Sequence, residues 1–392
     1  MKNLINRRDF LSSAAIVGAA GTILASDKQD VSKNEIQKIR VGIIGCGSVS
    51  GVYLPHLTNS PYAEVVSLCD IKSERAEHRA NTFHVQNFYP NIEAMLAGVP
   101  FDLLVNLTDM QEHGKLNRLA LTAKKFVWSE KPMANTYSEG RELHDLAVRS
   151  GVRIWGAPAV VNSPQFVYMS QQIQSNALGR VAAAHAHYGH EGPDWSAFFY
   201  EKGGGSLPDL GVYNIATITG LLGPAKSLVA MVNVVTPERH VRDKGSIQVI
   251  AEDNAMIIME HQNHALSHIQ CGFNYFDPYG HAGTGQDRPT ISIVGSEGNM
   301  HMIGYDWSPF GVDIQTKSNE KTRREATDAG GYVWEEGAST ICEYLATGKE
   351  PLINTEHALH VLEIIEAARL SQVEGKRIPL KSTFKWPMRN KP

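Results

Sequence analysis

A lysine follows a stretch expected to form a buried strand, in the sequence Ser129-Glu130-Lys131-Pro132. An ammonium group in such a place is costly unless it has a partner. Lys131 could hydrogen-bond a substrate hydroxyl and shift the proton affinity of that hydroxyl, which hydride transfer from a carbinol requires. The alternative interpretation is a solvated lysine at the end of a strand, and the motif alone leaves both open.

An aspartate and a tyrosine stand four residues apart at the end of a glycine-rich run, 203–213. On a helix this spacing places the side chains of Asp209 and Tyr213 on one face. A carboxylate and a phenol that converge there could pass a proton between them. The alternative is a helix-capping aspartate followed by a core tyrosine.

A β-branched run, 39–44, breaks into a glycine-containing turn before an expected helix. Gly45 permits the tight turn, and Gly47 lets the backbone approach a pyrophosphate at the helix N-terminus. Ser50 stands where the third glycine of such a turn is usual. The next apolar strand ends at Asp70, whose carboxylate can hold the adenosine ribose hydroxyls. Together these features favour a dinucleotide-binding turn over a tight turn in some other α/β sheet.

The first part of the chain alternates apolar strands with helical patterns, which predicts a doubly wound parallel sheet. The expected strands are 39–44, 63–69, 103–107, 126–129 and 153–156. The expected helices are 49–58, 73–83, 92–97, 114–124 and 138–149. Ligands bind outside the carboxyl ends of such strands. Asp70, Thr108 and Lys131 all fall at that edge.

Beyond residue 163 the pattern changes to short strands joined by turns, which predicts a large, open-faced, mainly antiparallel sheet. The expected strands are 181–188, 227–235, 246–251, 255–261, 266–273, 290–294 and 312–316. Helices are expected at 165–174, from the glycine-rich run to Leu222, and over the amphipathic segment 356–371, which we expect to pack back on the first domain. The domains are therefore predicted as 38–161 for dinucleotide binding and 162–392 for substrate binding and oligomerisation.

Composition restricts the classes of function. The chain has 392 residues, 42% hydrophobic and 20% charged, with a net charge of −4, and so lacks the basic character of a nucleic-acid binder. Its four cysteines form no C-x-x-C pair and predict neither a zinc site nor a redox motif. We interpret Cys46 and Cys69, at the ends of neighbouring strands, as buried thiols rather than a disulfide.

The first 37 residues are predicted to be an export signal and a flexible lead-in, outside the fold. Arg7 and Arg8 precede Phe10-Leu11 and a short Gly/Ala-rich apolar stretch, which resembles a twin-arginine signal. Asn6 departs from the usual residue of that signal. The alternative is an uncleaved anchor near a membrane. The expected location is therefore periplasmic, with no membrane partner after removal of the signal.

The combination of motifs resembles the glucose–fructose oxidoreductase / inositol dehydrogenase (Gfo/Idh/MocA) family. The resemblance rests on the Gly45 turn, on Glu130-Lys131-Pro132 and on the glycine-rich run into Asp209-Leu210-Gly211-Val212-Tyr213. It extends through Thr108 to His113 and through several later turns, and so covers nearly everything after residue 38. The chain departs from the family pattern at Ser50 and at Asp109, where proline is usual.

The resemblance implies a Rossmann domain followed by an open-faced α/β domain that often mediates oligomerisation. It implies hydride transfer to or from sugars, polyols or their derivatives, with Lys131, Asp209 and Tyr213 as the catalytic residues. Many members have histidine in place of Tyr213, whereas glucose–fructose oxidoreductase and its nearest relatives have tyrosine. We expect the cofactor to contact the following residues: Gly45, Gly47, Ser48, Val49, Asp70, Thr108, His113, Glu130 and Lys131.

Histidines and aromatic residues ahead of the glycine-rich run are candidates for substrate binding. His185 and His187 share one face of an expected strand, but no third ligand is apparent, so no metal site is predicted and a polar wall of a sugar cleft is favoured. Trp195 and Tyr200 could stack on a sugar ring or belong to the core, and we favour stacking. His281 is a further candidate at the rim of the cleft.

The sequence therefore predicts an exported oxidoreductase that transfers hydride between nicotinamide and a carbinol of a sugar, glycoside or polyol. NAD is expected in preference to NADP, because Asp70 would repel a 2′-phosphate, and it is expected to be tightly bound. The expected partners are a small carbohydrate and further copies of the chain. Two alternatives remain: an NAD-dependent glycosidase or lyase that oxidises transiently, without net redox, and a sensor that binds sugar and nucleotide without catalysis.

Overall fold

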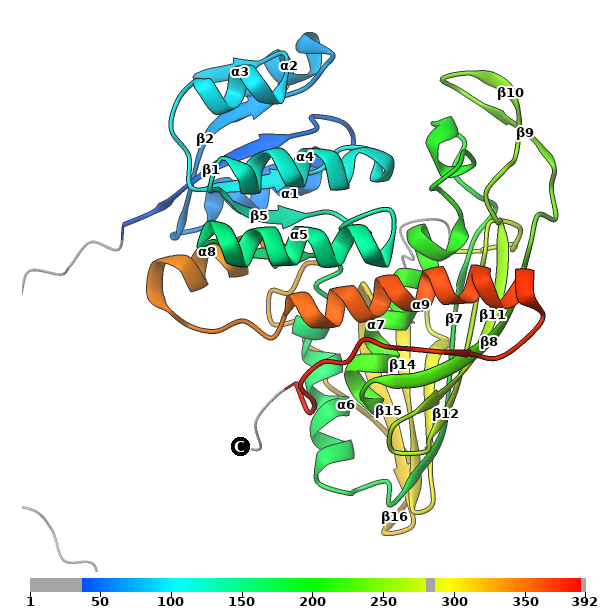
Figure 1. Cartoon of the computed structure of the whole chain (residues 1–392). Helices are drawn as coiled ribbons and strands as arrows, with labels where there is room; N and C mark the ends of the chain where they lie inside the picture. The colour runs from blue at the N-terminus through cyan, green and yellow to red at the C-terminus, as the bar shows by residue number, and fades with distance from the viewer. Residues whose placement is uncertain (1–36, 280–285, 389–392) are drawn as a thin grey trace, which may run out of the picture. The chain divides into compact units, whose positions relative to one another are not determined.

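The first sheet has six parallel strands in the order β3-β2-β1-β4-β5-β6 (Figure 1). The structure, a computed structural model, describes residues 37–279 and 286–388, so the expected export signal and His281 lie outside it. The strands are β1 Ile39–Ile44, β2 Ala63–Cys69, β3 Asn87–Tyr89, β4 Leu103–Asn106, β5 Phe126–Ser129 and β6 Ile154–Gly156. Most of their Val, Ile and Leu side chains are buried because helices cover both faces.

Helices alternate with these strands, as expected for a doubly wound sheet. They are α1 Ser50–Asn59, α2 Ser73–Phe83, α3 Ile92–Ala97, α4 His113–Thr122 and α5 Tyr137–Ser150. Local sequence sets their ends. In α5, for example, Thr136 accepts a hydrogen bond from the Glu139 N–H at the start, and Gly151 ends the helix in the left-handed conformation. A C-terminal helix that the sequence did not suggest, α8 Gly337–Thr347, returns to pack on β1, β2 and β5.

The second sheet has nine strands in the order β16-β15-β14-β13-β7-β12-β11-β8-β17. These strands are β7 Val181–Gly189, β8 Ala225–Asn233, β11 Asn254–His261, β12 Leu266–Gly272, β13 Pro289–Gly295, β14 Gly298–Tyr305, β15 Ser308–Thr316, β16 Asn319–Glu325 and β17 Ile378–Pro379. The β7–β12 pair is parallel and the other neighbouring pairs are antiparallel. A separate hairpin consists of β9 Glu238–Val241 and β10 Gly245–Gln248.

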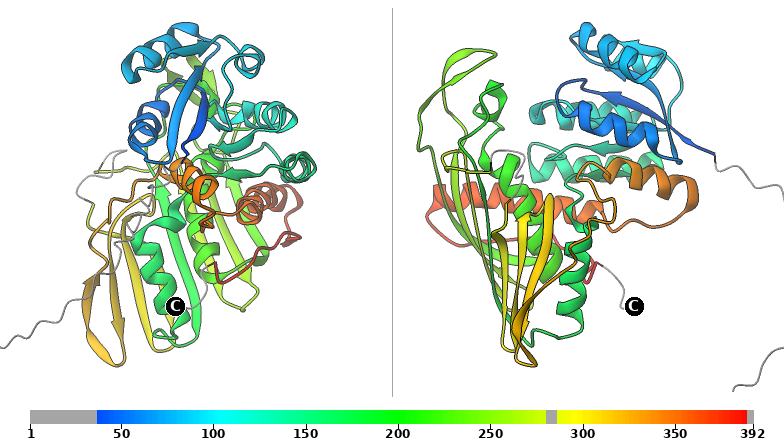
Figure 2. Two further views of the ribbon diagram at one scale, coloured as in Figure 1. Left: turned by 90° about the vertical axis from the view of Figure 1, so that its left-hand side faces the viewer. Right: turned by 180° about the vertical axis from the view of Figure 1, so that it is seen from behind.

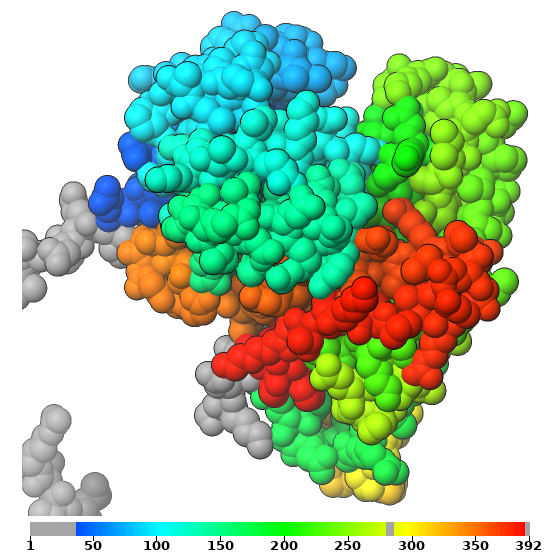
Figure 3. Space-filling view, in the orientation of Figure 1, coloured from blue at the N-terminus to red at the C-terminus, as the bar shows by residue number. Residues whose placement is uncertain are grey.

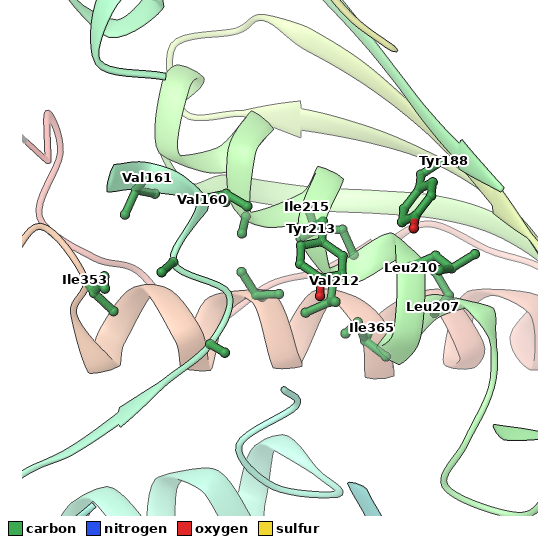
Figure 4. Packing of buried hydrophobic residues seen from close by; sticks show 14 of the residues in the cluster. Val160, Val161, Tyr188, Leu207, Leu210, Val212, Tyr213, Ile215, Ile353 and Ile365 are labelled. Carbon is green, nitrogen blue, oxygen red and sulfur yellow. The ribbon is translucent and has the colours of Figure 1, made fainter. Parts of the chain in front are cut away.

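Helices pack on one face of this sheet, the face turned towards the rest of the molecule (Figures 1 and 2). They are α6 Pro164–Gln174, α7 Val212–Leu222 and α9 Thr355–Glu374. Every residue of α7 is buried. Figure 4 shows the packing beside it, where Leu207, Leu210 and Ile215 lie near Ile365 of α9. Helix α9 contacts α5 and β6 as well as α7 and β8, so it touches both sheets' layers.

The other face of the nine-stranded sheet carries no helix in the described part of the chain (Figure 2). Alternate residues of β8, β11 and β12 point to it, and the apolar ones are 43–75% exposed: Val229, Met231, Met256, Ile258 and Leu266. We call these five residues the open-face patch. The histidines His185, His187 and His268 lie on the same face, because Ala184, Ala186 and Ile269 between them are buried under the helices.

The predicted fold class is confirmed, and β1, β2 and β5 have the predicted bounds. The sequence missed the strands β3, β14 and β16 and the short β9 and β17. Strand β3 is only three residues long, and β16 is an exposed edge strand of polar residues, so neither has an apolar pattern. Cys46 and Cys69 are buried thiols, as predicted. The described residues include no helix long and apolar enough to cross a membrane.

Candidate active site

A groove of about 650 Å³ runs past the turn between β1 and α1. Gly45 has φ +92°, and a Cβ there would lie 2.5 Å from the Leu107 carbonyl carbon, so this turn requires glycine. A Cβ on Gly47 would meet no atom within 4 Å, which leaves open space beside the first N–H groups of α1. Ser48 and Val49 line the same groove. The turn therefore fits a dinucleotide pyrophosphate.

Ser50 does not loosen the turn, although it replaces the usual third glycine. Its side chain is buried, and its hydroxyl donates to the Gly47 carbonyl over 2.6 Å. The guanidinium of Arg79, from α2, donates to the same carbonyl over 3.1 Å. The hydrogen bonds from Ser50 and Arg79 therefore fix the Gly47 carbonyl at the start of α1.

Asp70 ends β2 at the far end of this groove, where the sequence predicted the ribose-binding carboxylate. It is 7% exposed. One carboxylate oxygen accepts from the Cys46 N–H and the other from the Lys72 N–H, both over 2.8 Å. These two bonds fix the carboxylate beside the glycine turn, with lone pairs left for ribose hydroxyls.

A second cavity, of about 280 Å³, adjoins the groove and is lined from both sheets. Ser48, Val49, Leu107, Thr108, Trp195, Phe198 and Phe199 line both spaces. Figure 3 shows a hollow between the helices of the first sheet, in cyan, and the green segment that follows β7. The three predicted catalytic residues, Lys131, Asp209 and Tyr213, all line the cavity.

Lys131 and Asp209 form an ion pair at this cavity, and each side chain is 12% exposed. The ammonium lies 2.7 Å from the Asp209 carboxylate and 2.9 Å from the Asp209 carbonyl oxygen. Among the contacts made by the described residues, these use two of its three N–H donors and leave one for the cavity. A lysine at the end of a buried strand needs a partner, and here the partner is Asp209, which belongs to the second domain.

Tyr213 lies under the same lysine, with the Lys131 ammonium 5.2 Å from the centre of its ring. Burial raises the pKa of Tyr213 well above 10, and the charges of Glu130, Asp209, Asp306 and Glu335 raise it further. At neutral pH the residue is therefore a phenol that donates a hydrogen bond, rather than a base.

The backbone before Tyr213 differs from the expected α-helix. Leu207–Gly211 is a turn of π-helix, and α7 begins only at Val212. Such turns recur at functional sites, because the extra residue turns a side chain out of the regular spiral. Gly205, with φ +115°, precedes the turn, and a Cβ there would clash with the Glu252 carboxylate. That carboxylate accepts two bonds from Arg369 of α9, over 3.0 and 2.9 Å, and so anchors the loop.

Glu130 accepts a hydrogen bond from Tyr53, which in turn contacts Trp128, and the sequence analysis singled out neither residue. Tyr53 of α1 donates to one Glu130 oxygen over 2.7 Å and lies 3.2 Å from the indole nitrogen of Trp128. The other Glu130 oxygen accepts from the Lys131 N–H over 2.9 Å. Tyr53 is fully buried, and a buried phenol needs a hydrogen-bond partner. A tyrosine in the helix after the glycine turn was the one feature of the sequence that could have pointed to this contact.

His113 and Thr108 join the two strand ends beside the cavity. The ring nitrogens of His113 lie 2.7 Å from the Pro132 carbonyl and 2.9 Å from the Thr108 carbonyl. Burial lowers the pKa of this histidine. Its ring therefore ties the loop after β4 to the loop after β5, although the residue also lines the cavity.

Only some of the predicted substrate-binding residues that the structure describes line the cavity or the groove. Trp195 lines both the cavity and the groove. Tyr200 does not line them: it is 1% exposed, its hydroxyl donates to the Pro193 carbonyl, and it belongs to the core. His187 does not line them either, because it points to the open face of the sheet, whereas its neighbour Tyr188 points into the cavity. His281 lies outside the described residues.

The aromatic wall of the cavity was missed by the sequence analysis. Besides Tyr188 it includes Trp307, from the turn between β14 and β15, and Trp334, from the segment before α8. No local pattern connects these three positions. The described residues contain no group of three or more His, Cys, Asp or Glu side chains that could hold a metal ion.

The arrangement combines a dinucleotide groove with an adjacent cavity that holds an ion-paired ammonium and a phenol. When bound in the groove, NAD supplies a hydride acceptor. The cavity lining offers a bound hydroxyl group one ammonium N–H of Lys131, the phenol of Tyr213 and the carboxylate of Asp209.

Comparison with known proteins agrees with this arrangement. Residues 39–157 match the family model "Oxidoreductase family, NAD-binding Rossmann fold", and residues 166–301 match the "GFO/IDH/MocA C-terminal domain". The chain is 23% identical to D-apiose dehydrogenase of Paraburkholderia graminis over 366 residues, 88% of this chain and 91% of that protein. It is 26% identical to mouse trans-1,2-dihydrobenzene-1,2-diol dehydrogenase over 84% of this chain and 96% of that protein.

Solved structures show the same fold. Levoglucosan dehydrogenase in complex with NADH and L-sorbose superposes with a TM-score of 0.75 at 17% identity, covering 88% of this chain and 99% of that one. The two family models follow one another in the expected order: the first covers the six-stranded sheet, and the second covers the nine-stranded sheet from β7 to the start of β14. The chain belongs to the Gfo/Idh/MocA family of NAD-binding oxidoreductases.

Proposed function

We propose that this oxidoreductase interconverts a carbinol and a carbonyl group in a sugar, glycoside or polyol. The observation that carries the proposal is the Lys131–Asp209 pair, which lies beside Tyr213 in a cavity continuous with the dinucleotide groove. The relatives support this substrate class, because D-apiose dehydrogenase and levoglucosan dehydrogenase are named for sugars or sugar derivatives.

Each residue has a role that its contacts suggest. Lys131 donates its remaining N–H to the reacting oxygen and stabilises the negative charge that develops there. Asp209 holds the ammonium in place and accepts the proton that an alcohol loses on oxidation. Tyr213 stays a phenol and donates a second hydrogen bond to the same oxygen, since its pKa is raised.

A substrate panel tests the proposal. Purified protein with NAD is incubated with monosaccharides, glycosides and polyols, and keto products are detected by mass together with nicotinamide absorbance. Net reduction of NAD with a keto product supports the proposal. Release of a reducing sugar from an aryl glycoside without net change in absorbance would instead indicate an oxidise-and-eliminate glycosidase, and binding without either reaction would indicate a sensor.

A second copy of the chain is proposed to cover the open-face patch. Five exposed apolar side chains on three adjacent strands form a continuous surface of the kind that marks an interaction site. A two-fold axis through a flat sheet face brings the same residues of both copies together. The expected state is a dimer, or a tetramer built from dimers, and light scattering of the purified protein measures it.

Export is proposed on the sequence alone, from Arg7 and Arg8 before the apolar stretch. The twin-arginine route carries folded cargo, so NAD would be bound before export and held tightly afterwards. Replacing both arginines by lysine should abolish export, and protein taken from the envelope should contain nucleotide. Unchanged export of that variant, or nucleotide-free protein, would overturn the respective part.

A further inference from the structure

Among the described residues, a single lysine or arginine lines the cavity that adjoins the dinucleotide groove, and it is already ion-paired. We propose that the cavity selects an uncharged ring compound bearing hydroxyl groups and excludes sugar acids and sugar phosphates. The inference rests on the proposed function, since it concerns the substrate of that same site.

Part of the cavity wall consists of aromatic rings that pack against other rings. Trp307 stacks on Tyr305, with ring centres 5.6 Å apart and planes 15° apart, and Tyr188 packs on Tyr305 at 4.4 Å. Trp334 meets the ring of Tyr53 edge-on at 5.8 Å. Three large rings, those of Tyr188, Trp307 and Trp334, therefore face the cavity from fixed positions. Such surfaces match the C–H face of a ring rather than a charged group.

The ionisable lining of the cavity offers an anion no unpaired cation. Among the described residues Lys131 is the one lysine or arginine that lines it, and its ammonium is already ion-paired with Asp209. Glu130 adds a second carboxylate, so the lining has two acids against one ammonium. The remaining N–H of Lys131 can serve a hydroxyl group, but the charge of the ammonium is already balanced.

The dinucleotide groove has a mixed lining. Lys72, Arg75 and Arg79 line it together with four carboxylates, those of Asp70, Glu74, Asp109 and Asp243, and the Arg79 guanidinium contacts the glycine turn. None of these three cations lines the substrate cavity. A carboxylate or phosphate moved into the cavity would lose its hydration without gaining a counter-ion, which is costly.

Matched pairs of compounds test the selection on the NAD-loaded full chain. Each pair shares one ring and differs in one charged group, a carboxylate or a phosphate: methyl β-D-glucopyranoside against methyl β-D-glucuronide, and D-glucose against D-glucose 6-phosphate, with the corresponding galactose compounds. We expect kcat/KM for the charged member to be lower by about 100-fold or more. A charged member with equal or higher kcat/KM would overturn the proposal.

Two variants of Trp334 test whether the discrimination against charged compounds depends on the lining of the cavity. Trp334→Arg places a cation in the wall and should shrink the neutral-to-charged ratio by about tenfold or more, whereas Trp334→Phe keeps the wall aromatic and uncharged and should leave the ratio unchanged. An unchanged ratio in Trp334→Arg, with binding retained, would count against the inference.

Calorimetric titration with the same pairs separates this inference from the proposed function. Binding of the neutral members alone, without turnover, would support the selection and contradict the oxidoreductase proposal. Equal binding of the charged members, or failure of every neutral member to bind, would overturn the selection whatever the turnover.

Discussion

The two faces of the nine-stranded sheet differ in what covers them, although alternate residues of the same strands build both. On strand β7, Tyr188 points into the cavity beside Lys131, while His187 next to it points to the helix-free face. The covered face therefore contributes to the site of chemistry, and the open face carries the patch proposed for association. A strand with a period of two assigns one set of residues to each task.

Histidines show the same contrast. His261, His357 and His360 lie on the covered side, where burial lowers the pKa to about 4, 4 and 3 respectively. Each has hydrogen-bond partners there, as in the 2.9 Å contact of His357 with the Thr219 hydroxyl. On the open face, the pKa of His268 is lowered by its partial burial and by the neighbouring His185. Protonation is thus far more costly on the covered side.

Loss of Lys131 should break the covered-face chemistry most severely. In Lys131→Ala the reacting oxygen loses its charged donor and Asp209 its partner, so we expect kcat to fall by about 10³–10⁴-fold. Lys125→Ala is the matched control, since this lysine precedes the same strand at its opposite end and donates to the Phe101 carbonyl. Steady-state turnover measures both. Near-normal turnover in Lys131→Ala, with NAD still bound, would remove the centre of the mechanism.

Tyr213→Phe should have a smaller effect on the same chemistry. It keeps the ring under the Lys131 ammonium but removes the phenolic donor, and we expect kcat to fall by about 100-fold. The double variant with Lys131→Ala should lose much less than the product of the single losses if the residues act as a unit. Multiplicative losses would show that they act separately. Tyr200→Phe, which removes a phenol outside the cavity, serves as the control.

A substitution on the open face should change the association of the chain with further copies and leave turnover unchanged. Ile258→Glu puts a charge at the centre of the open-face patch, and in a two-fold contact the charge appears in both copies. We expect the dissociation constant of the assembly to rise by about tenfold or more, measured by sedimentation. Val148→Glu, at an exposed site on α5, is the control. Identical association of both variants would place the interface elsewhere.

The sequence was most informative where one residue type does one physical job. Gly45, the carboxylate after β2 and the lysine after β5 were singled out because a tight turn, a ribose and a buried ammonium each restrict the residue type. The structure places the first in a turn with positive φ and the other two at the groove and the cavity. The first sheet was found for a similar reason, since strands buried on both faces have continuous apolar runs.

The rest depends on contacts between distant segments. Alternation shows that His185 and His187 share a face but not which face meets the cavity. His187 is absent from the cavity lining, and Tyr188, which lines it, was not singled out. Trp307 and Trp334 come from a turn and a loop, which have no periodicity. Tyr200 precedes the catalytic run in sequence, yet its hydroxyl turns back to Pro193 and away from the cavity.

The smallest expected effect concerns the covered-side histidines and the pH dependence of stability. A histidine with a lowered pKa in the folded state stabilises that state above its unfolded pKa of 6.5, and this contribution is lost as the pH falls towards the folded value. Because His357 has a pKa of about 4 in the folded protein, the free energy of unfolding should fall by about 1 kcal/mol between pH 7 and pH 5.5.

The variant His357→Gln tests this expectation, since glutamine can still donate a hydrogen bond to Thr219 but cannot titrate. The gap between its free energy of unfolding and that of the parent should shift by this amount over that interval. Denaturant titrations repeated at several protein concentrations separate any contribution from assembly, and His268→Gln on the open face should shift the gap much less. Equal shifts for the two histidines would show that the faces do not differ in this respect.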